Sequence, residues 1–299
     1  MTKCSCYAYR ENLVKECHNK KTGISEKETA ALMEKNKLDE CHMEIIKALG
    51  CMEYAGKSHI MRYMEYIHPA GDKNTDLTKK LKQLCDYGIV LSVCYYPSDN
   101  PCGYRTCNIY SLTGGGRDIF TGTGENRRCQ GSYTPLREMD SRDGIKGVLN
   151  RAAFNSFYVS SLSYNAKYYF SYHAGSAVIE GRLMILSDKY SEGLVNVCMI
   201  PVRNMEGSDT ECVLKIRAAQ EHFRQKRIKK PWFVLVCEDD AHERELYSYL
   251  MNCKTIEKAV ICMTKDTYLV RNDADAFDNI TTYTQNGKEL VSEFKKIIF

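Results

Sequence analysis

The stretch LTKKLKQLCDYGIVLSVCYYPSDNPCGYRTCNIYSL, residues 77–112, decides the expected fold. Leucines recur at helical spacing from about Asn74 up to Gly88, and glycine is a typical C-terminal cap. After Gly88 the hydrophobic period changes from 3.6 to 2, and the residues are rich in β-formers. Residues 89–96 and 105–112 flank a turn-forming segment with two prolines. The sequence therefore predicts a helix followed by a β-hairpin.

Two further helices are expected just before this stretch. Asp39 is a typical N-cap, and apolar residues follow it at helical spacing. Another helix is expected from Ser58, and the His-Pro-Ala-Gly segment 68–71 ends it. Three helices followed by a hairpin are the layout of a winged helix-turn-helix. In that fold the third helix enters the major groove of DNA, and the hairpin tip contacts the backbone.

The polar face of the third helix carries side chains that suit DNA. Lysines neutralise phosphates, while Asn, Thr and Gln hydrogen-bond base edges. The candidate DNA-binding residues are Lys73, Asn74, Thr75, Lys79, Lys80, Lys82 and Gln83 on the helix, with Arg105 on the hairpin. Two other interpretations remain open: the solvated face of an ordinary core helix, and a winged helix that serves as a protein-interaction module.

Composition and charge limit the class of protein. The net charge is +4, with 42 Lys and Arg against 38 Asp and Glu. Residues 1–137 hold 20 basic and 16 acidic residues, and residues 138–299 hold 22 of each, so the excess lies in the N-terminal part. This distribution favours a polyanionic partner there. There is no apolar run long enough for a membrane span or a secretory signal, which predicts a cytoplasmic protein without a membrane partner.

The sequence predicts two domains of the α+β or α/β class. We expect an N-terminal extension over 1–37, the winged helix-turn-helix over 38–122, a linker over 123–142 and an α/β domain over 143–299. Ser25 and Glu28 have the form of a capping box within the extension. The glycine-rich segment that follows the hairpin lacks the Gly-Lys-Ser/Thr of a phosphate loop, so we expect it to lead into a short helix.

Residues 143–299 predict a mixed sheet flanked by helices. The expected order is α-β-β-β-α-β-α-β, with a hairpin over residues 177–202 and a second capping box at Ser208 and Glu211. This order is that of restriction-endonuclease-like cores. An active member needs an acid on the hairpin and an acid-x-Lys pair on the next strand, which bind Mg²⁺ and orient water. Residues 196–199 offer neither, so the core is degenerate and catalysis is not expected.

An enzyme alternative stays open nonetheless. A metal-dependent DNA endonuclease would use Mg²⁺ and acids drawn from Glu180, Asp188, Glu238, Asp239 and Asp240. The competing interpretation of the last three is that Asp239 or Asp240 caps the helix that follows. Without that alternative we expect no cofactor.

Fifteen cysteines are many for a cytosolic chain, yet no paired C-x-x-C set appears. Cys17 and His18 are adjacent, and Cys198, Cys237, Cys253 and Cys262 lie in apolar runs. We therefore expect scattered thiols rather than a zinc site. Leu290, Val291, Phe294, Ile297 and Ile298 predict an amphipathic terminal helix. Because many winged helices bind paired half-sites, a homodimer is the expected state.

The chain resembles the replication-relaxation family over about residues 39–270. The motifs are LKQLCDYGIV at 81–90, IYSLTGGGRDIF at 109–120, SDTECVLKIRAAQEHF at 208–223 and PWFVLVCEDDAHERELYSYL at 231–250. Arg203 stands where that family often has an acid, a departure that further weakens nuclease chemistry. The resemblance implies a winged-helix DNA-binding accessory of plasmid or conjugative mobile elements. It would act in mobilisation, replication or transcription regulation, with a relaxase or replication proteins as partners.

Overall fold

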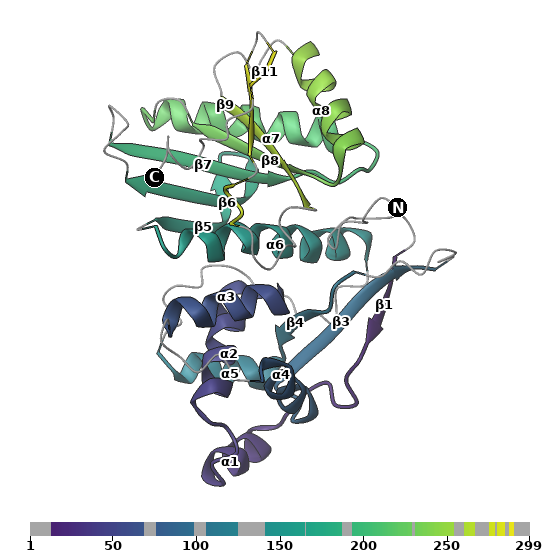
Figure 1. The fold of residues 1–299 in the computed structure, drawn as a ribbon, viewed down its shortest axis with the longest axis vertical. Helices are drawn as coiled ribbons and strands as arrows, with labels where there is room; N and C mark the ends of the chain where they lie inside the picture. The colour runs from purple at the N-terminus through teal and green to yellow at the C-terminus, as the bar shows by residue number, and fades with distance from the viewer. Residues whose placement is uncertain are drawn as a thin grey trace. The chain divides into compact units, whose positions relative to one another are not determined.

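The structure is a computed structural model. It describes residues 13–68, 76–98, 106–124, 141–164, 166–186, 193–228, 231–253, 260–266, 275–278, 280–284 and 287–289. The chain forms two compact units, one made by Glu11–Asn155 and one containing Ser156–Phe299. Each unit combines helices with a sheet (Figure 1). The protein is therefore of the mixed α+β class, as the sequence predicts.

The N-terminal unit opens with a strand and a helix, and a helical group and a hairpin follow. Its elements are β1 (Leu13–Cys17), α1 (Glu26–Glu34), α2 (Glu40–Met52), β2 (Ala55–Gly56), α3 (Lys57–Ile67), α4 (Leu77–Asp86), β3 (Val90–Pro97), β4 (Ile109–Leu112) and α5 (Gly114–Gly122). The three expected helices and the hairpin are thus present.

The four strands of this unit form one antiparallel sheet in the order β1-β3-β4-β2. In the hairpin, Val90 lies opposite Leu112. The two-residue strand β2 joins the outer side of β4, where Ala55 lies opposite Tyr110. This short pairing connects the segment between α2 and α3 to the hairpin. The sequence pattern did not reveal β1 or β2, because both are short and lack strict alternation.

The core of the N-terminal unit lies where α2, α4 and α5 meet the sheet. Ile46, Leu84 and Phe120 have no exposed surface. Gly50 of α2 faces the Phe120 ring so closely that a side-chain carbon at position 50 would overlap it. The glycine therefore lets α2 and α5 approach each other.

The helix caps explain where several of these helices begin. Asp39 caps α2 and accepts a hydrogen bond from the His42 N–H, as the sequence predicts. Ser25 and Glu28 form the expected capping box of α1. The glycine-rich segment begins α5, which Thr113 caps. Asp76 caps α4, so that helix begins at Leu77, a few residues after the expected start.

The second unit is built on a mixed seven-stranded sheet. Its elements are the end of α6 (Arg142–Ser161), then β5 (Lys167–Ala174), β6 (Ala177–Leu186), β7 (Leu194–Pro201), α7 (Ser208–Gln225), β8 (Trp232–Cys237), α8 (Asp240–Asn252), β9 (Val260–Lys265), β10 (Thr281–Thr284) and β11 (Gly287–Glu289). The strand order is β11-β10-β9-β8-β7-β6-β5, and only the β7–β8 and β8–β9 pairs are parallel. The predicted order from α6 to β9 is confirmed.

Helices α7 and α8 share one core with the strands of this sheet. Phe223 of α7 and Leu246 of α8 are buried in the same cluster as Phe233 and Leu235 of β8. The end of α6 packs elsewhere on the unit, where the Tyr158 ring lies 4.2 Å from that of Tyr168. The expected core residues Cys198, Cys237 and Cys262 are buried, whereas Cys253 is half-buried.

Two further sequence expectations differ from the structure. Ser208 does not cap α7; it is the first helical residue, and Gly207 occupies the N-cap position. Gly207 has φ +80°, a left-handed conformation that glycine adopts without strain and that turns the chain into the helix one residue early. The units divide within α6, at 155/156, later than the expected domain start at 143. Arg151 and Asn155 account for this, because they bind the turn after α2.

Candidate nucleic-acid interface

Helix α4 has one buried side, and this side determines where the other side chains of the helix lie. Leu77, Leu81 and Leu84 are buried against the rest of the N-terminal unit. Their spacing of four and three residues keeps them on one side of the helix. The remaining side chains of α4 therefore lie either on its flanks or toward solvent.

One flank of α4 is bound to the start of α2. The Lys80 ammonium forms an ion pair with the Asp39 carboxylate. Nε2 of His42 lies 3.1 Å from Oε1 of Gln83, while Nδ1 of His42 accepts the Asp39 N–H at 3.2 Å. Partial burial works to raise the pKa of Asp39, but the hydrogen bonds from Lys80 and the His42 N–H outweigh it and leave that pKa lowered. Lys80 and Gln83 thus hold α4 against the N-terminus of α2.

The outer side of α4 carries two exposed lysines. Lys79 and Lys82 are both exposed, and they are three residues apart on one helix face. Neither ammonium group has an ion pair or hydrogen bond with any residue that the structure describes. On the second flank, the Lys57 ammonium donates to the Thr78 hydroxyl at 2.6 Å. The outer side of α4, with Lys79 and Lys82, therefore presents two positive charges to solvent.

Four of the candidate DNA-binding residues lie outside the described residues. These are Lys73, Asn74, Thr75 and Arg105. The structure thus places the other four candidates on one helix, where they have different surroundings. These four are Lys79, Lys80, Lys82 and Gln83. Lys79 and Lys82 face solvent, whereas Lys80 and Gln83 bind residues at the start of α2.

The junction between α4 and β3 is held by Asn19, which follows β1. Its Nδ2 donates to the carbonyl oxygens of Cys85, at 3.2 Å, and Val90, at 2.7 Å. Its Oδ1 accepts the Ser92 N–H at 2.7 Å. One side chain therefore bonds the last turn of α4 and two positions of β3. This contact sets the direction of the helix relative to the hairpin strand.

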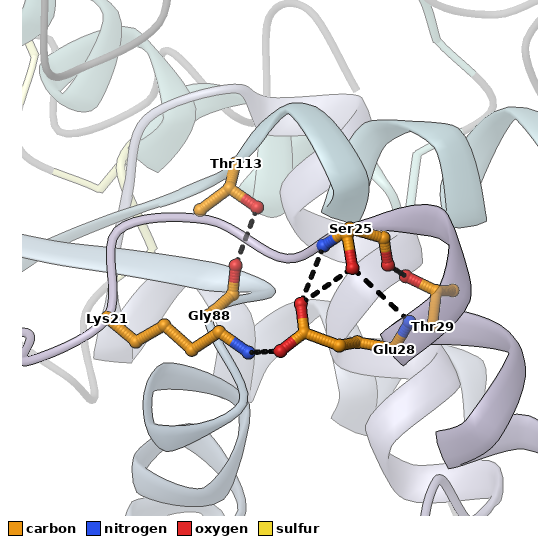
Figure 2. Close-up of polar contacts among 6 residues, drawn as sticks. All are labelled: Lys21, Ser25, Glu28, Thr29, Gly88 and Thr113. Carbon is orange, nitrogen blue, oxygen red and sulfur yellow. Dashed lines mark hydrogen bonds and ion pairs between the residues drawn. The ribbon is translucent and has the colours of Figure 1, made fainter.

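The loop between α4 and β3 is also closely packed. Gly88 has φ +75°, and a side-chain carbon there would overlap the Gly23 carbonyl oxygen. The Thr113 hydroxyl donates to the Gly88 carbonyl oxygen at 2.8 Å (Figure 2). Figure 2 also shows Glu28 accepting from Lys21 at 2.8 Å while it completes the capping box of α1. Gly23, which precedes β3 in the sequence, and Thr113, which follows it, thus both contact Gly88 at the end of α4.

In the second unit, charged side chains gather where the parallel strands end. Arg203, after β7, and Asp266, after β9, form an ion pair with no exposed surface. Lys265 pairs with Asp240 and lies 3.4 Å from the Glu243 carboxylate. These charges largely neutralise one another inside the unit.

Asp239 and His242 lie at the start of α8, directly after strand β8. Asp239 caps α8 and accepts the N–H groups of Ala241 and His242, which confirms the capping interpretation of the acidic cluster. His242 is buried, and its Nδ1 accepts the Glu238 N–H at 3.2 Å. Burial lowers the pKa of His242 to about 4, and the Arg203 charge adds to this against the opposite effect of the Asp239 charge, so the ring is neutral at pH 7. Asp239 and His242 therefore stabilise the first turn of α8 by hydrogen bonds to backbone N–H groups.

The acids named for an endonuclease do not converge. Glu180 of β6 accepts from the Lys215 ammonium at 2.5 Å, and Lys215 also lies 3.0 Å from Glu211. Burial works to lower the pKa of Lys215, but the two carboxylates outweigh it and raise that pKa, so the lysine stays charged.

The sheet register places Glu180 far from the acids that follow β8. Glu180 precedes Gly181, which pairs with Met199, and Ile200 pairs with Leu235. Glu238 lies three residues beyond Leu235. With strands about 4.8 Å apart and residues about 3.3 Å apart, the Cα atoms of Glu180 and Glu238 are about 14 Å apart. Both side chains would have to extend fully toward one metal ion at that separation, and the Glu180 carboxylate binds Lys215 instead. Asp188 lies outside the described residues.

No family model, curated protein or solved structure matches this chain. The resemblance to the replication-relaxation family therefore remains a prediction from the motifs. Among the helices that the structure describes, none combines the length and the apolar character needed to cross a bilayer.

Sequence reasoning missed the residues that orient α4. Asn19 lies in a segment expected to be an N-terminal extension, and His42 lies in the helix expected after Asp39, whose apolar pattern does not include it. Their partners are 41 to 73 residues away along the chain. Periodicity reports which side of a helix is buried, but it carries no information about such distant polar contacts.

Proposed function

We propose that this protein binds double-stranded DNA without catalysis, through α4 and the β3–β4 hairpin of a winged helix-turn-helix. The sheet topology supports the fold assignment. A short strand between the first two helices pairs with the second strand of the hairpin, giving the order β2-β4-β3 beside α2, α3 and α4. Three helices and a hairpin connected in this way leave one side of the third helix free for the major groove.

The observation that carries the proposal is the outer side of α4. Lys79 and Lys82 are exposed there, while the leucines opposite are buried. A long lysine side chain on a rigid helix reaches phosphates on either side of a groove. Lys73, Asn74, Thr75 and Arg105 lie outside the described residues, and they are proposed to contact the DNA as well.

The structure suggests different roles for the two remaining candidates. Lys80 is paired with Asp39 and Gln83 with His42, so both act first as positioning residues that orient α4. Lys80 then contributes less to phosphate binding than its neighbours, because its charge is already compensated. Gln83 reaches a base edge only if it leaves His42.

The biological role proposed for this activity follows the family resemblance. A non-catalytic winged helix with a second α+β unit fits an accessory or regulatory factor of a mobile element. Such a factor supports mobilisation, replication or transcription, and its partners would be a relaxase or replication proteins.

The experiment that tests the proposal compares binding of a labelled duplex pool, by fluorescence anisotropy, between the parent protein and Lys79→Ala/Lys82→Ala. Loss of two phosphate contacts is expected to weaken binding about 30-fold at about 0.15 M salt. The matched control is Lys35→Ala/Lys167→Ala, which removes the same charge from exposed positions on elements other than α4. Equal weakening by both double variants would indicate non-specific charge attraction. Tight partner binding without DNA retention would favour the protein-interaction alternative.

A further inference from the structure

A cluster of three potential metal ligands joins β1 to β3 in the N-terminal unit. One ligand atom each from Glu16, His18 and Cys94 lies within 4.8 Å of the other two. The Cys94 Sγ and the Glu16 Oε2 are 3.7 Å apart. In a tetrahedral zinc site, bonds of about 2.3 Å to sulfur and about 2.1 Å to oxygen place the two ligand atoms about 3.6 Å apart. The cysteine and glutamate are therefore already at the separation that a shared zinc ion requires.

The strand pairing holds these side chains together. Glu16 lies directly opposite Cys94 in the antiparallel ladder, and opposite residues project from the same face of a sheet. The ladder continues one residue past β1, because the His18 N–H donates to the Ser92 carbonyl oxygen at 3.0 Å. His18 is two residues from Glu16 and so projects to the same face. The backbone, rather than flexible loops, brings the three ligands together.

The chemistry of the three groups favours zinc over hard cations. Thiolate, imidazole and carboxylate are all zinc ligands, whereas Mg²⁺ and Ca²⁺ take oxygen ligands almost exclusively. Cys94 is 1% exposed, and His18 is exposed. The cluster thus has a buried sulfur and an open side, which leaves room for a water molecule as the fourth ligand.

We propose that Glu16, His18 and Cys94 bind one Zn²⁺ ion, which clips the N-terminal strand β1 to the hairpin strand β3. On binding, the Cys94 thiol releases its proton to solvent as the Sγ–Zn bond forms. The clip lies just before Asn19, the residue that orients α4. Zinc is therefore expected to stabilise the N-terminal unit, and this inference does not depend on DNA binding.

The sequence alone does not disclose this site. Cys17 and His18 are adjacent and attract attention as a candidate pair, but Cys17 lies opposite Val93 and projects to the other face of β1. The thiol that completes the cluster comes from a strand 78 residues after Glu16. Cys17 is exposed and serves as a matched control, because it is a neighbouring thiol outside the cluster.

The test uses the full-length protein, stripped of metal with a chelator under reducing conditions and titrated with Co²⁺ as a spectroscopic probe. The parent is expected to bind one equivalent with a thiolate-to-cobalt charge-transfer band, which Zn²⁺ then displaces. Cys94→Ser abolishes the band, whereas Cys17→Ser retains it. A Cys94→Ser band equal to that of the parent would overturn the assignment, since the thiolate ligand would then lie elsewhere among the cysteines.

His18→Gln tests the same site if replacement of the buried Cys94 disturbs folding. His18→Gln changes an exposed residue, and circular dichroism of the metal-free variant checks its fold. Loss of this ligand is expected to weaken zinc affinity at least as much as loss of an outer-shell partner, about 10- to 100-fold. Zinc-edge absorption should show one sulfur at about 2.3 Å with nitrogen or oxygen neighbours at about 2.0–2.1 Å. Unchanged affinity in His18→Gln, two or more sulfur ligands, or no zinc bound at micromolar concentrations would each contradict the proposal.

Discussion

Replacing Asn19 by alanine is expected to destabilise the N-terminal unit specifically. The side chain makes three hydrogen bonds, with the carbonyl oxygens of Cys85 and Val90 and with the N–H of Ser92. Alanine removes all three at once and supplies no replacement. The last turn of α4 and the start of β3 then lose the one side chain that bonds both of them.

The magnitude follows from the number and the burial of the partners. A typical hydrogen bond contributes about 0.5–1.5 kcal/mol to stability, and a buried group left without a partner costs about 1–3 kcal/mol. Val90 and Ser92 are buried, but water can reach part of the space left by the side chain. We expect Asn19→Ala to lower the free energy of unfolding by about 2–4 kcal/mol. Asn252→Ala, at the exposed end of α8, is the control and should change it by less than about 0.5 kcal/mol.

Urea unfolding followed by two signals measures this effect. Far-ultraviolet circular dichroism reports both units, whereas the single tryptophan, Trp232, reports the second unit. Hydrogen exchange of the α4 and β3 amides locates the loss and should be accelerated in Asn19→Ala. A stability change below about 0.5 kcal/mol, with unchanged exchange in α4 and β3, would refute the reasoning that Asn19 orients this helix.

Three further predictions concern other parts of the structure. Gly88→Ala should destabilise by about 1–3 kcal/mol in thermal unfolding, because it adds left-handed strain and a clash with Gly23; Gly114→Ala, in open space, should not, and equal effects would contradict this. His242 has its pKa lowered to about 4 in the folded protein, so the unfolded chain binds the extra proton first and stability should fall by about 3 kcal/mol as pH drops from about 6.5 to about 4. His242→Gln should flatten that dependence, and an unchanged profile would reject it. Supercoiled plasmid should stay intact with Mg²⁺ or Mn²⁺, whereas cleavage lost in Glu180→Ala would favour the endonuclease alternative.

The helices of the N-terminal unit were predictable because their signals are local. Asp39 and the apolar residues after it define α2, and the leucine spacing defines α4. The change of period after Gly88 marks the hairpin. Each of these signals depends on residues within one or two turns of the chain, where capping and amphipathicity operate.

The remaining features depend on contacts between distant segments. β1 is a strand because its backbone completes the edge of β3, and its own sequence, LVKEC, has no strong alternation. The roles of Lys80 and Gln83 follow from Asp39 and His42, 41 residues earlier. A helical wheel places both residues on the polar part of α4, and only the fold shows that α2 binds them.

The second unit shows the same contrast between local signals, which were predictable, and long-range contacts, which were not. The strand and helix order was predictable from apolar runs and turn residues, and so was the cap at Asp239. The pairing of Arg203 with Asp266 was not, because it joins the ends of two strands 63 residues apart. Among the described acids that suggested a metal site, Asp239 caps α8, and Glu180 and Asp240 form ion pairs with lysines.

The central claim, that the outer side of α4 contacts DNA phosphates, is tested most directly by the salt dependence of duplex binding. Each phosphate contact contributes about 0.9 to the slope of log affinity against log salt concentration. Lys79→Ala/Lys82→Ala is therefore expected to make that slope shallower by about 1.8, while Lys35→Ala/Lys167→Ala leaves it unchanged. A slope equal to that of the parent in Lys79→Ala/Lys82→Ala would contradict the account.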